Sequence, residues 1–368
     1  MKRVLILGGY ELGNLGDDAL ALSTAIYCLK SGIECTFESK QSAYVPTMIF
    51  RELNFMPHDT TADYEAIIYG GGTLFYSYSN AQSQSKIIRF SKKVYSVIKK
   101  PKVLYDFFYS MLKIRKASKT SDIIMLGMGF GPFHGNKLQL SRVRDIASNT
   151  KIIGVRDVKS LDCLDEINVS NTFLMHDLCL TREFSDYLKT NGNKPPVNTS
   201  DLSKTYLTVI PRDWNRTENG KLLSFKLKRY CGKVLEDGKG INFQFYSLIE
   251  DQEWKSFAEG LQSRYPDLVN ITTWNPRLES MRDFICQLED TEFVISMRFH
   301  GAIFSMLLQA PCFIVPIDQK LTQLSARYGL REWNDQIFSL CKYSLTLDTE
   351  TALNENSDLL IKIFEKIS

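Results

Sequence analysis

The sequence lacks the spacings that mark metal and redox sites. No two of its eight cysteines form a C-x-x-C pair, the spacing typical of zinc and redox motifs. No uninterrupted apolar run approaches the ~20 residues that span a bilayer, and no N-terminal apolar core has the ~7–15 residues of a secretory signal. The net charge of +3 is too small to indicate a nucleic-acid binder. We therefore expect a cytoplasmic protein with reduced thiols, no metal ion and no nucleic-acid partner.

The sequence does contain a repeated alternation of short apolar runs with longer helical patterns. In the first half we expect strands at Arg3–Gly8, Ile33–Phe37, Glu65–Tyr69, Ile123–Gly127, Lys151–Val155 and Thr172–Met175. In the second half we expect them at Tyr206–Ile210, Asn242–Tyr246, Val269–Ile271, Phe293–Ile295 and Cys312–Val315. This alternation predicts an α/β fold in which helices cover both faces of parallel sheets.

A polar stretch with paired prolines divides the chain. We predict an N-terminal Rossmann-like, doubly wound domain over 1–188, with a basic helical insertion at 84–119 on its acceptor or membrane side. A linker at 189–204 and a donor-side C-terminal Rossmann-like domain at 205–345 follow, and a helix within 346–368 packs back on the first domain. Because such sheets bind ligands beyond the carboxyl ends of their strands, the two domains are expected to face one cleft.

Glycine-rich segments follow several expected strands. The first, Gly8–Ala19, opens a helix and contains Asn14, Gly16 and Asp17. Its backbone N–H groups would stabilise a bound anion. Asp17 is expected either to hold a hydroxyl group or to cap the helix, and Asp18 is the other candidate for the cap. Loops containing Gly71, Gly72 and Gly129 are expected to let a ligand approach the backbone closely.

The segment Ser296–Pro311 places Arg298 and His300 at a strand-to-helix turn. Alternation along an extended chain would direct both side chains to one face, where arginine binds an anion and histidine supplies a proton. Arg212 follows the first strand of the second domain and would point into the cleft. The alternative for His300 is a structural role at the start of the helix.

Six motifs in the same order resemble the polysaccharide pyruvyltransferase family over roughly residues 1–330. They are Gly13–Ala19, Gly70–Gly72, Gly127–Pro132, Arg156-Asp157 with Ser160, Pro211-Arg212 with Trp214, and Met297–Ser305, completed by Pro311 and Asp318-Gln-Lys320. The resemblance implies a fold like that of GT-B glycosyltransferases. It also implies phosphoenolpyruvate as donor, a sugar as acceptor and a pyruvyl ketal as product.

By position, the resemblance places Arg212, Arg298 and His300 at phosphoenolpyruvate and Asp17 near the acceptor hydroxyls. The residue types suit this chemistry, because the donor carries a carboxylate and a phosphate. We expect His300 to protonate the methylene carbon and Asp17 to accept a hydroxyl proton. No cofactor is expected beyond the donor substrate, and the reaction needs no metal ion.

The insertion carries eleven lysines and arginines between Lys86 and Lys119 against one acid, Asp106. Basic residues interleaved with large apolar ones are typical of a helix that binds an anionic membrane surface. The residues expected to do so are Lys92, Lys93, Lys99, Lys100, Arg115 and Lys116. A peripheral position on the inner face of the membrane would suit a lipid-linked oligosaccharide acceptor. The alternative is an amphipathic helix packed on the sheet.

Two other functions remain open from the sequence. One is a GT-B glycosyltransferase that uses a nucleotide-sugar, since the turn with Arg298 and His300 would also suit a diphosphate. The other is a sugar- or anion-binding protein without turnover.

Overall fold

The computed structural model describes residues 2–38, 44–57, 64–75, 121–131, 133, 136–190, 205–334 and 349–368. Its framework is two parallel six-stranded sheets, ordered β2-β1-β3-β4-β5-β6 and β12-β11-β10-β7-β8-β9. The first sheet contains β1 Arg3–Leu7, β2 Glu34–Phe37, β3 Ala66–Phe75, β4 Asp122–Phe130, β5 Thr150–Val155 and β6 Thr172–Leu174. The second contains β7 Thr205–Ile210, β8 Ile241–Phe245, β9 Val269–Thr273, β10 Thr291–Ser296, β11 Cys312–Ile314 and β12 Arg331–Glu332. The expected α/β fold with two doubly wound sheets is confirmed.

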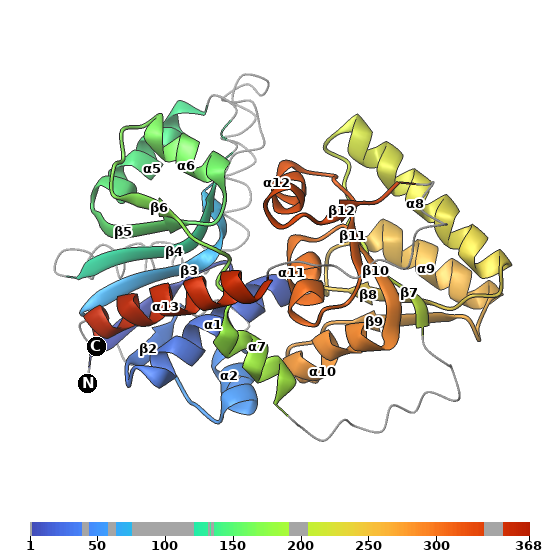
Figure 1. Ribbon diagram of the computed structural model, residues 1–368, viewed down its shortest axis with the longest axis horizontal. Coiled ribbons are helices and arrows are strands. Elements are labelled where there is room, and N and C mark those ends of the chain that lie inside the picture. Colours follow the sequence, from blue (N-terminus) through green and yellow to red (C-terminus); the bar gives the residue numbers. More distant parts are fainter. Residues whose placement is uncertain are drawn as a thin grey trace, which may run out of the picture.

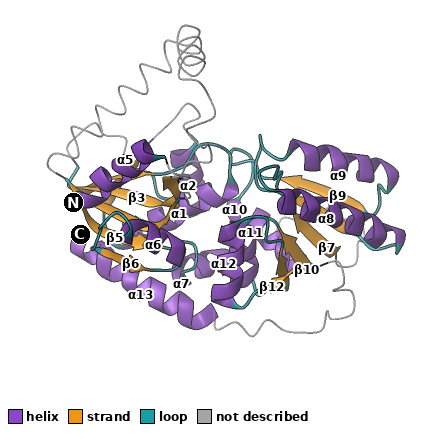
Figure 2. Cartoon of the chain, turned by 90° about the horizontal axis from the view of Figure 1, so that it is seen from above, coloured by secondary structure: helices purple, strands orange, loops and turns teal. Residues whose placement is uncertain are grey.

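Helices cover both sheets (Figures 1 and 2). Those of the first are α1 Leu15–Lys30, α2 Val45–Leu53, α5 Lys137–Ser148, α6 Val158–Asp165 and α7 Arg182–Lys189. Those of the second are α8 Glu218–Glu236, α9 Gln252–Arg264, α10 Met281–Cys286, a 3₁₀ turn Gln287–Asp290, α11 Phe299–Leu307 and α12 Gln319–Tyr328. The last helix, α13 Thr349–Ile367, contacts α1 and α7. We call the first sheet with its helices and α13 the N-terminal domain, and the rest the C-terminal domain. The domain and linker boundaries expected from the sequence stay a prediction.

The glycine run expected after a strand lies inside one. β3 continues to Phe75, and Gly72 pairs with Met128 of β4 before the register shifts. Gly71 and Gly72 have φ values of 82° and 85°, which an L side chain rarely adopts. Gly71, Gly72 and Gly129 therefore belong to the carboxyl ends of β3 and β4 rather than to loops, because the parallel pairing continues through them.

Helix α1 begins before the two aspartates considered as its cap, and its N-terminus is hydrogen-bonded to the other domain. Asn14 is its N-cap, and the Asn14 side chain accepts a hydrogen bond from the Gly16 N–H. The expectation that Asp17 or Asp18 caps the helix is wrong, since both lie in its first turn. The Leu15 N–H donates to the Tyr246 carbonyl at 2.9 Å. The α1 N-terminus thus lies against the carboxyl end of β8.

Asp18 is completely buried at this domain junction. Its carboxylate accepts hydrogen bonds from the Tyr44 hydroxyl at 2.6 Å and from Trp274 Nε1 of the C-terminal domain at 2.8 Å. Burial raises the pKa of Asp18 to about 7, although both hydrogen bonds act in the opposite direction. Asp18 is a structural contact between the domains.

This raised pKa makes stability depend on pH. The folded state binds a proton at Asp18 that the unfolded state releases above pH 4, so stability should fall as pH rises from about 4 to about 7. One such proton changes the free energy of unfolding by up to ~1.4 kcal/mol per pH unit. We expect Asp18→Asn to flatten this decline in urea unfolding at pH 4.5, 5.5, 6.5 and 7.5. Parallel curves for the two proteins would contradict the assignment.

Candidate functional site

The loops at the carboxyl ends of both sheets bring Asp17 and His300 together. His300 lies in the first turn of α11, between the rings of Phe299 and Phe304. A Cβ added to Gly16 would collide with Nδ1 of His300. The position next to Asp17 must therefore be glycine for the histidine of the other domain to approach α1.

Asp17 lies over the glycine backbones at the carboxyl edge of the first sheet. Added Cβ atoms would lie 3.5 Å from its Oδ2 at Gly9 and 3.7 Å from its Oδ1 at Gly72. Burial raises the pKa of Asp17, whereas the positive charges of His300 and Arg156 lower it. Raised basicity and a location beside His300 suit a carboxylate that accepts a proton.

A buried ion pair forms the N-terminal wall of this site. Arg156 donates through Nη1 to Asp177 Oδ2 at 2.9 Å and through Nη2 to the Thr73 hydroxyl at 3.1 Å. Its guanidinium stacks on Phe299 of the C-terminal domain at 4.3 Å. A Cβ on Gly129 would approach Thr73 Oγ1 to 2.7 Å. Gly129 thus makes room for the hydrogen bond between Thr73 and Arg156.

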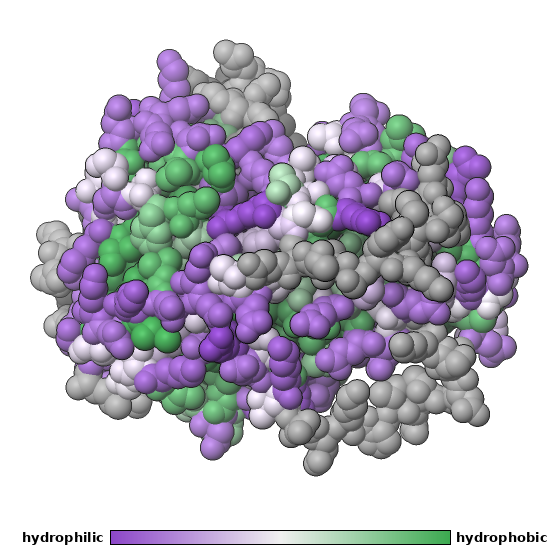
Figure 3. Space-filling model, in the orientation of Figure 1, coloured by the Kyte–Doolittle hydropathy of each residue, from purple (hydrophilic) through white to green (hydrophobic). Residues whose placement is uncertain are grey.

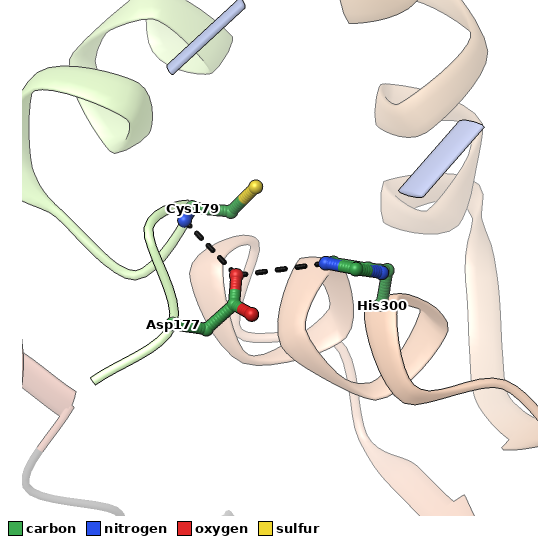
Figure 4. Close-up of side chains that lie close together, drawn as sticks. All are labelled: Asp177, Cys179 and His300. Atoms are coloured by element: carbon green, nitrogen blue, oxygen red, sulfur yellow. Dashed lines mark hydrogen bonds and ion pairs between the residues drawn. The ribbon is translucent and has the colours of Figure 1, made fainter. Parts of the chain in front are cut away.

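Asp177 turns its other oxygen toward His300 (Figure 4). His300 Nε2 lies 3.5 Å from Asp177 Oδ1. Burial alone would raise the pKa of Asp177, but His300 and Arg156 hold it well below its usual range. The carboxylate is therefore negatively charged at neutral pH.

The C-terminal domain adds two cations. Arg212 lies 3.6 Å from Asp318 and stacks on Trp214 at 5.1 Å. Lys320, in the first turn of α12, has a pKa lowered to about 8 by burial and by the charges of Arg156 and Arg212. No hydrogen bond or ion pair to the Lys320 amine is found within the described ranges. Three electrostatically coupled cations therefore share this junction.

Arg298 is placed differently from the expectation. Its guanidinium donates to the Pro211 carbonyl at 3.1 Å, to Glu250 at 3.0 Å and to Asp251. Arg298 has extended backbone angles as the α11 N-cap, whereas His300 is helical. The two side chains therefore point in different directions, and the expected common face is not formed. The Arg298 side chain is only 7 % exposed, so it fixes the loop that carries Asp251.

Asp177, Cys179 and His300 bring possible metal-ligand atoms within 4.8 Å of one another. Burial and the charge of Asp177 raise the pKa of the Cys179 thiol well above its usual value. The Asp177 carboxylate is already paired with Arg156. Since a cysteine ligand must be deprotonated, this arrangement suits an ion-pair network better than a metal ion.

The sequence analysis overlooked Asp177 as a partner for His300, and it included Lys320 only in the motif Asp318-Gln-Lys320. The signal for Asp177 was its position two residues after an expected strand. The predicted membrane-binding residues, Lys92 to Lys116, lie outside the described residues.

Among the described helices, none is both long and apolar enough to cross a bilayer. In Figure 3 polar side chains cover most of the visible face, and apolar side chains gather mainly on the lobe at the left.

Comparison with known proteins gives a family match and a fold match. The sequence pattern of the family described as "Polysaccharide pyruvyl transferase" matches residues 14–319. The fold is similar to UDP-GlcNAc 2-epimerase from Methanocaldococcus jannaschii, with TM-score 0.59, 13% identity and 100% of each chain covered. It is also similar to UDP-N-acetylglucosamine 2-epimerase from Rickettsia bellii, with TM-score 0.56, 12% identity and coverage of 100% and 96%. No curated protein matches the sequence significantly.

Proposed function

Because the chain belongs to the polysaccharide pyruvyl transferase family, we propose that it transfers the pyruvyl group of phosphoenolpyruvate to a sugar. The product is a pyruvyl ketal, and phosphate is released. The observation that carries this proposal is the meeting of His300 with Asp17 beside three cations, Arg156, Arg212 and Lys320. An anionic donor and a proton transfer both suit this set.

In this proposal Arg212 and Lys320 bind the phosphate and carboxylate groups of the donor, together with His300. Lys320 supports this role because partial burial and the charges of Arg156 and Arg212 destabilise its ammonium form, which a donor anion would offset. Arg298, first expected at the donor, instead positions the loop behind it through Asp251 and Glu250. Sugar hydroxyls approach Asp17 above the backbones of Gly9 and Gly72. Asn14, Gly16, Gly71 and Gly129 lie at the same edge of the sheet, where Gly16 makes room for His300 and Gly71 for Leu20.

The reaction follows from these positions. His300 gives a proton to the methylene carbon, and the double-bond electrons form the new C–H bond, which leaves C2 electrophilic. A sugar hydroxyl attacks C2 while Asp17 accepts its proton. The C2–O bond to phosphate then breaks, its electron pair stays on the phosphate oxygen, and the proton held by Asp17 leaves with the phosphate. A second hydroxyl attacks C2 to close the ketal ring and returns its proton to neutral His300, which restores the acid. A positioned acid or base accelerates such a step by ~10²–10⁴-fold.

The acceptor is proposed to be a lipid-linked oligosaccharide or polysaccharide repeat unit. The support is the basic, aromatic-rich composition between Lys86 and Lys119, which would attract an anionic membrane surface. Binding to vesicles with and without anionic lipid tests this part separately from the chemistry.

Thermal stabilisation by phosphoenolpyruvate, measured beside a panel of nucleotides and nucleotide-sugars, tests the donor. A ligand at ~100 times its dissociation constant stabilises the protein by about 2.7 kcal/mol. Phosphate release in the presence of sugar acceptors then separates an enzyme from a binding protein. Stabilisation by a nucleotide-sugar alone would overturn pyruvyl transfer and favour the glycosyltransferase alternative.

Donor affinity should fall above pH 8, because Lys320 then loses its proton. The donor phosphate is largely ionised above pH ~7. The protonation of Lys320 therefore dominates the pH dependence of donor affinity between pH 7 and 9. Affinity is expected to fall by up to ~10-fold per pH unit above the pKa of about 8. Calorimetry at pH 7, 8 and 9 measures this. Lys320→Arg stays charged and should remove the decline, and an equal decline in that variant would refute the assignment.

A further inference from the structure

Asp177 is held by the N-terminal domain at three points. Its Oδ2 accepts from Arg156 Nη1 at 2.9 Å, and its Oδ1 accepts from the Cys179 N–H at 3.1 Å. Its main-chain carbonyl accepts from Asn356 Nδ2 of α13 at 2.9 Å. Only 2 % of Asp177 is exposed. These contacts fix the direction in which the carboxylate presents its negative charge.

The group that meets this charge comes from the other domain. His300 Nε2 lies 3.5 Å from Asp177 Oδ1, is buried, and has no hydrogen-bond partner at closer range among the described residues. Figure 4 shows the ring edge directed at the carboxylate. The opposite ring nitrogen, Nδ1, lies against Gly16 on the side of α1.

The geometry points to Asp177 as the positioning residue that holds the proton on Nε2 of His300 and so leaves Nδ1 to perform the proton transfer. This inference rests on the proposed function, because it assumes that His300 is the acid. In the transfer, the Nδ1–H bond breaks and its electron pair stays on Nδ1. The proton forms the new C–H bond at the donor methylene, and neutral His300 keeps its proton on Nε2.

The charge balance around His300 supports this role. The anions that face its ring are Asp177 from the loop after β6 and Asp17 from α1, and Arg156 approaches through Asp177. Because the pKa of Asp177 is held well below its usual range, its charge persists throughout the neutral range. A fixed anion beside an imidazole stabilises the imidazolium form. Any separation of the two domains would break this pairing.

The test uses Asp177→Asn and the ring signals of the histidines. The chain has only four histidines, so a ¹⁵N-histidine-labelled sample gives few signals, and His300→Gln identifies the one required. In Asp177→Asn, the ring ¹⁵N shifts of neutral His300 should lose their preference for the tautomer that is protonated at Nε2. We expect kcat to fall at least ~10-fold, while KM for phosphoenolpyruvate changes by less than about threefold.

Asp18→Asn is the matched control, because Asp18 is also a buried carboxylate at the domain junction but is bonded to Tyr44 and Trp274. An unchanged His300 tautomer in Asp177→Asn, or an equal change in Asp18→Asn, would overturn the inference.

Asp177→Asn removes the counter-ion of buried Arg156. A second variant keeps the inference testable if Asp177→Asn does not fold. Asp177→Glu keeps the charge and displaces the oxygens, and it should lower kcat while the His300 ring stays protonated at Nε2. Wild-type kcat in Asp177→Glu would overturn the inference. Absence of phosphoenolpyruvate turnover in the wild type would instead refute the proposed function, and the ring signals would still decide the pairing.

Discussion

Replacing His300 with glutamine is expected to lower kcat by ~10²–10⁴-fold, the usual contribution of a positioned acid. Glutamine keeps a polar group of similar reach but cannot deliver a proton to carbon. Binding of phosphoenolpyruvate should weaken far less, because Arg212 and Lys320 retain their charges in the variant. Phosphate release measures kcat, and calorimetry with the donor alone measures binding.

His176→Gln provides the matched control for this experiment. His176 is half-buried at the domain junction, where its Nδ1 lies 2.6 Å from the Tyr328 hydroxyl. Burial and the charge of Arg327 lower the pKa of His176 to about 4, so it is neutral at working pH. Loss of stability with retained kcat is expected in His176→Gln. If both variants lost activity in proportion to their stability, His300 would have only a structural role.

The fold could be predicted from the sequence because apolar runs and turn residues are local signals. The glycine run at Gly70–Gly72 misled the prediction, since consecutive glycines usually end a strand. In the structure β4 supplies a pairing partner for them, Gly70 with Leu126 and Gly72 with Met128. Pairing with residues more than fifty positions away allows β3 to continue through the glycines, and no local sequence pattern predicts such pairing.

The same limit explains the site. Strand-end positions suggested Asp17, Arg212 and His300 as cleft residues, and their roles stay a prediction. The structure brings Asp17 and His300 together. The two-residue spacing of Arg298 and His300 suggested one shared face, but the backbone changes from extended to helical between them. Asp177 and Lys320 belong to the site because they interact with charged residues on distant elements. The spacing of residues in one sequence does not show which distant elements will meet.

Arg298→Ala is expected to lower the free energy of unfolding by about 3–5 kcal/mol, the usual cost of removing one member of a buried ion pair. Asp251 is only 3 % exposed, and Arg298 is its cationic partner. Without the guanidinium, a buried carboxylate would lose its counter-ion. Urea unfolding measures the loss. Lys151→Ala removes a solvent-exposed pair with Asp122 and should cost at most ~1 kcal/mol.

Asp251→Asn distinguishes a structural Arg298 from one that binds the donor. Asp251 has a φ of 67°, a conformation that asparagine tolerates. If Arg298 serves mainly to neutralise Asp251, adding Asp251→Asn to Arg298→Ala should recover about 1–3 kcal/mol, because the orphaned charge is removed. Donor affinity of the folded double variant should then stay near that of Asp251→Asn alone. Wild-type stability with lost donor binding in Arg298→Ala would mean instead that the guanidinium leaves the acidic loop and contacts phosphoenolpyruvate directly.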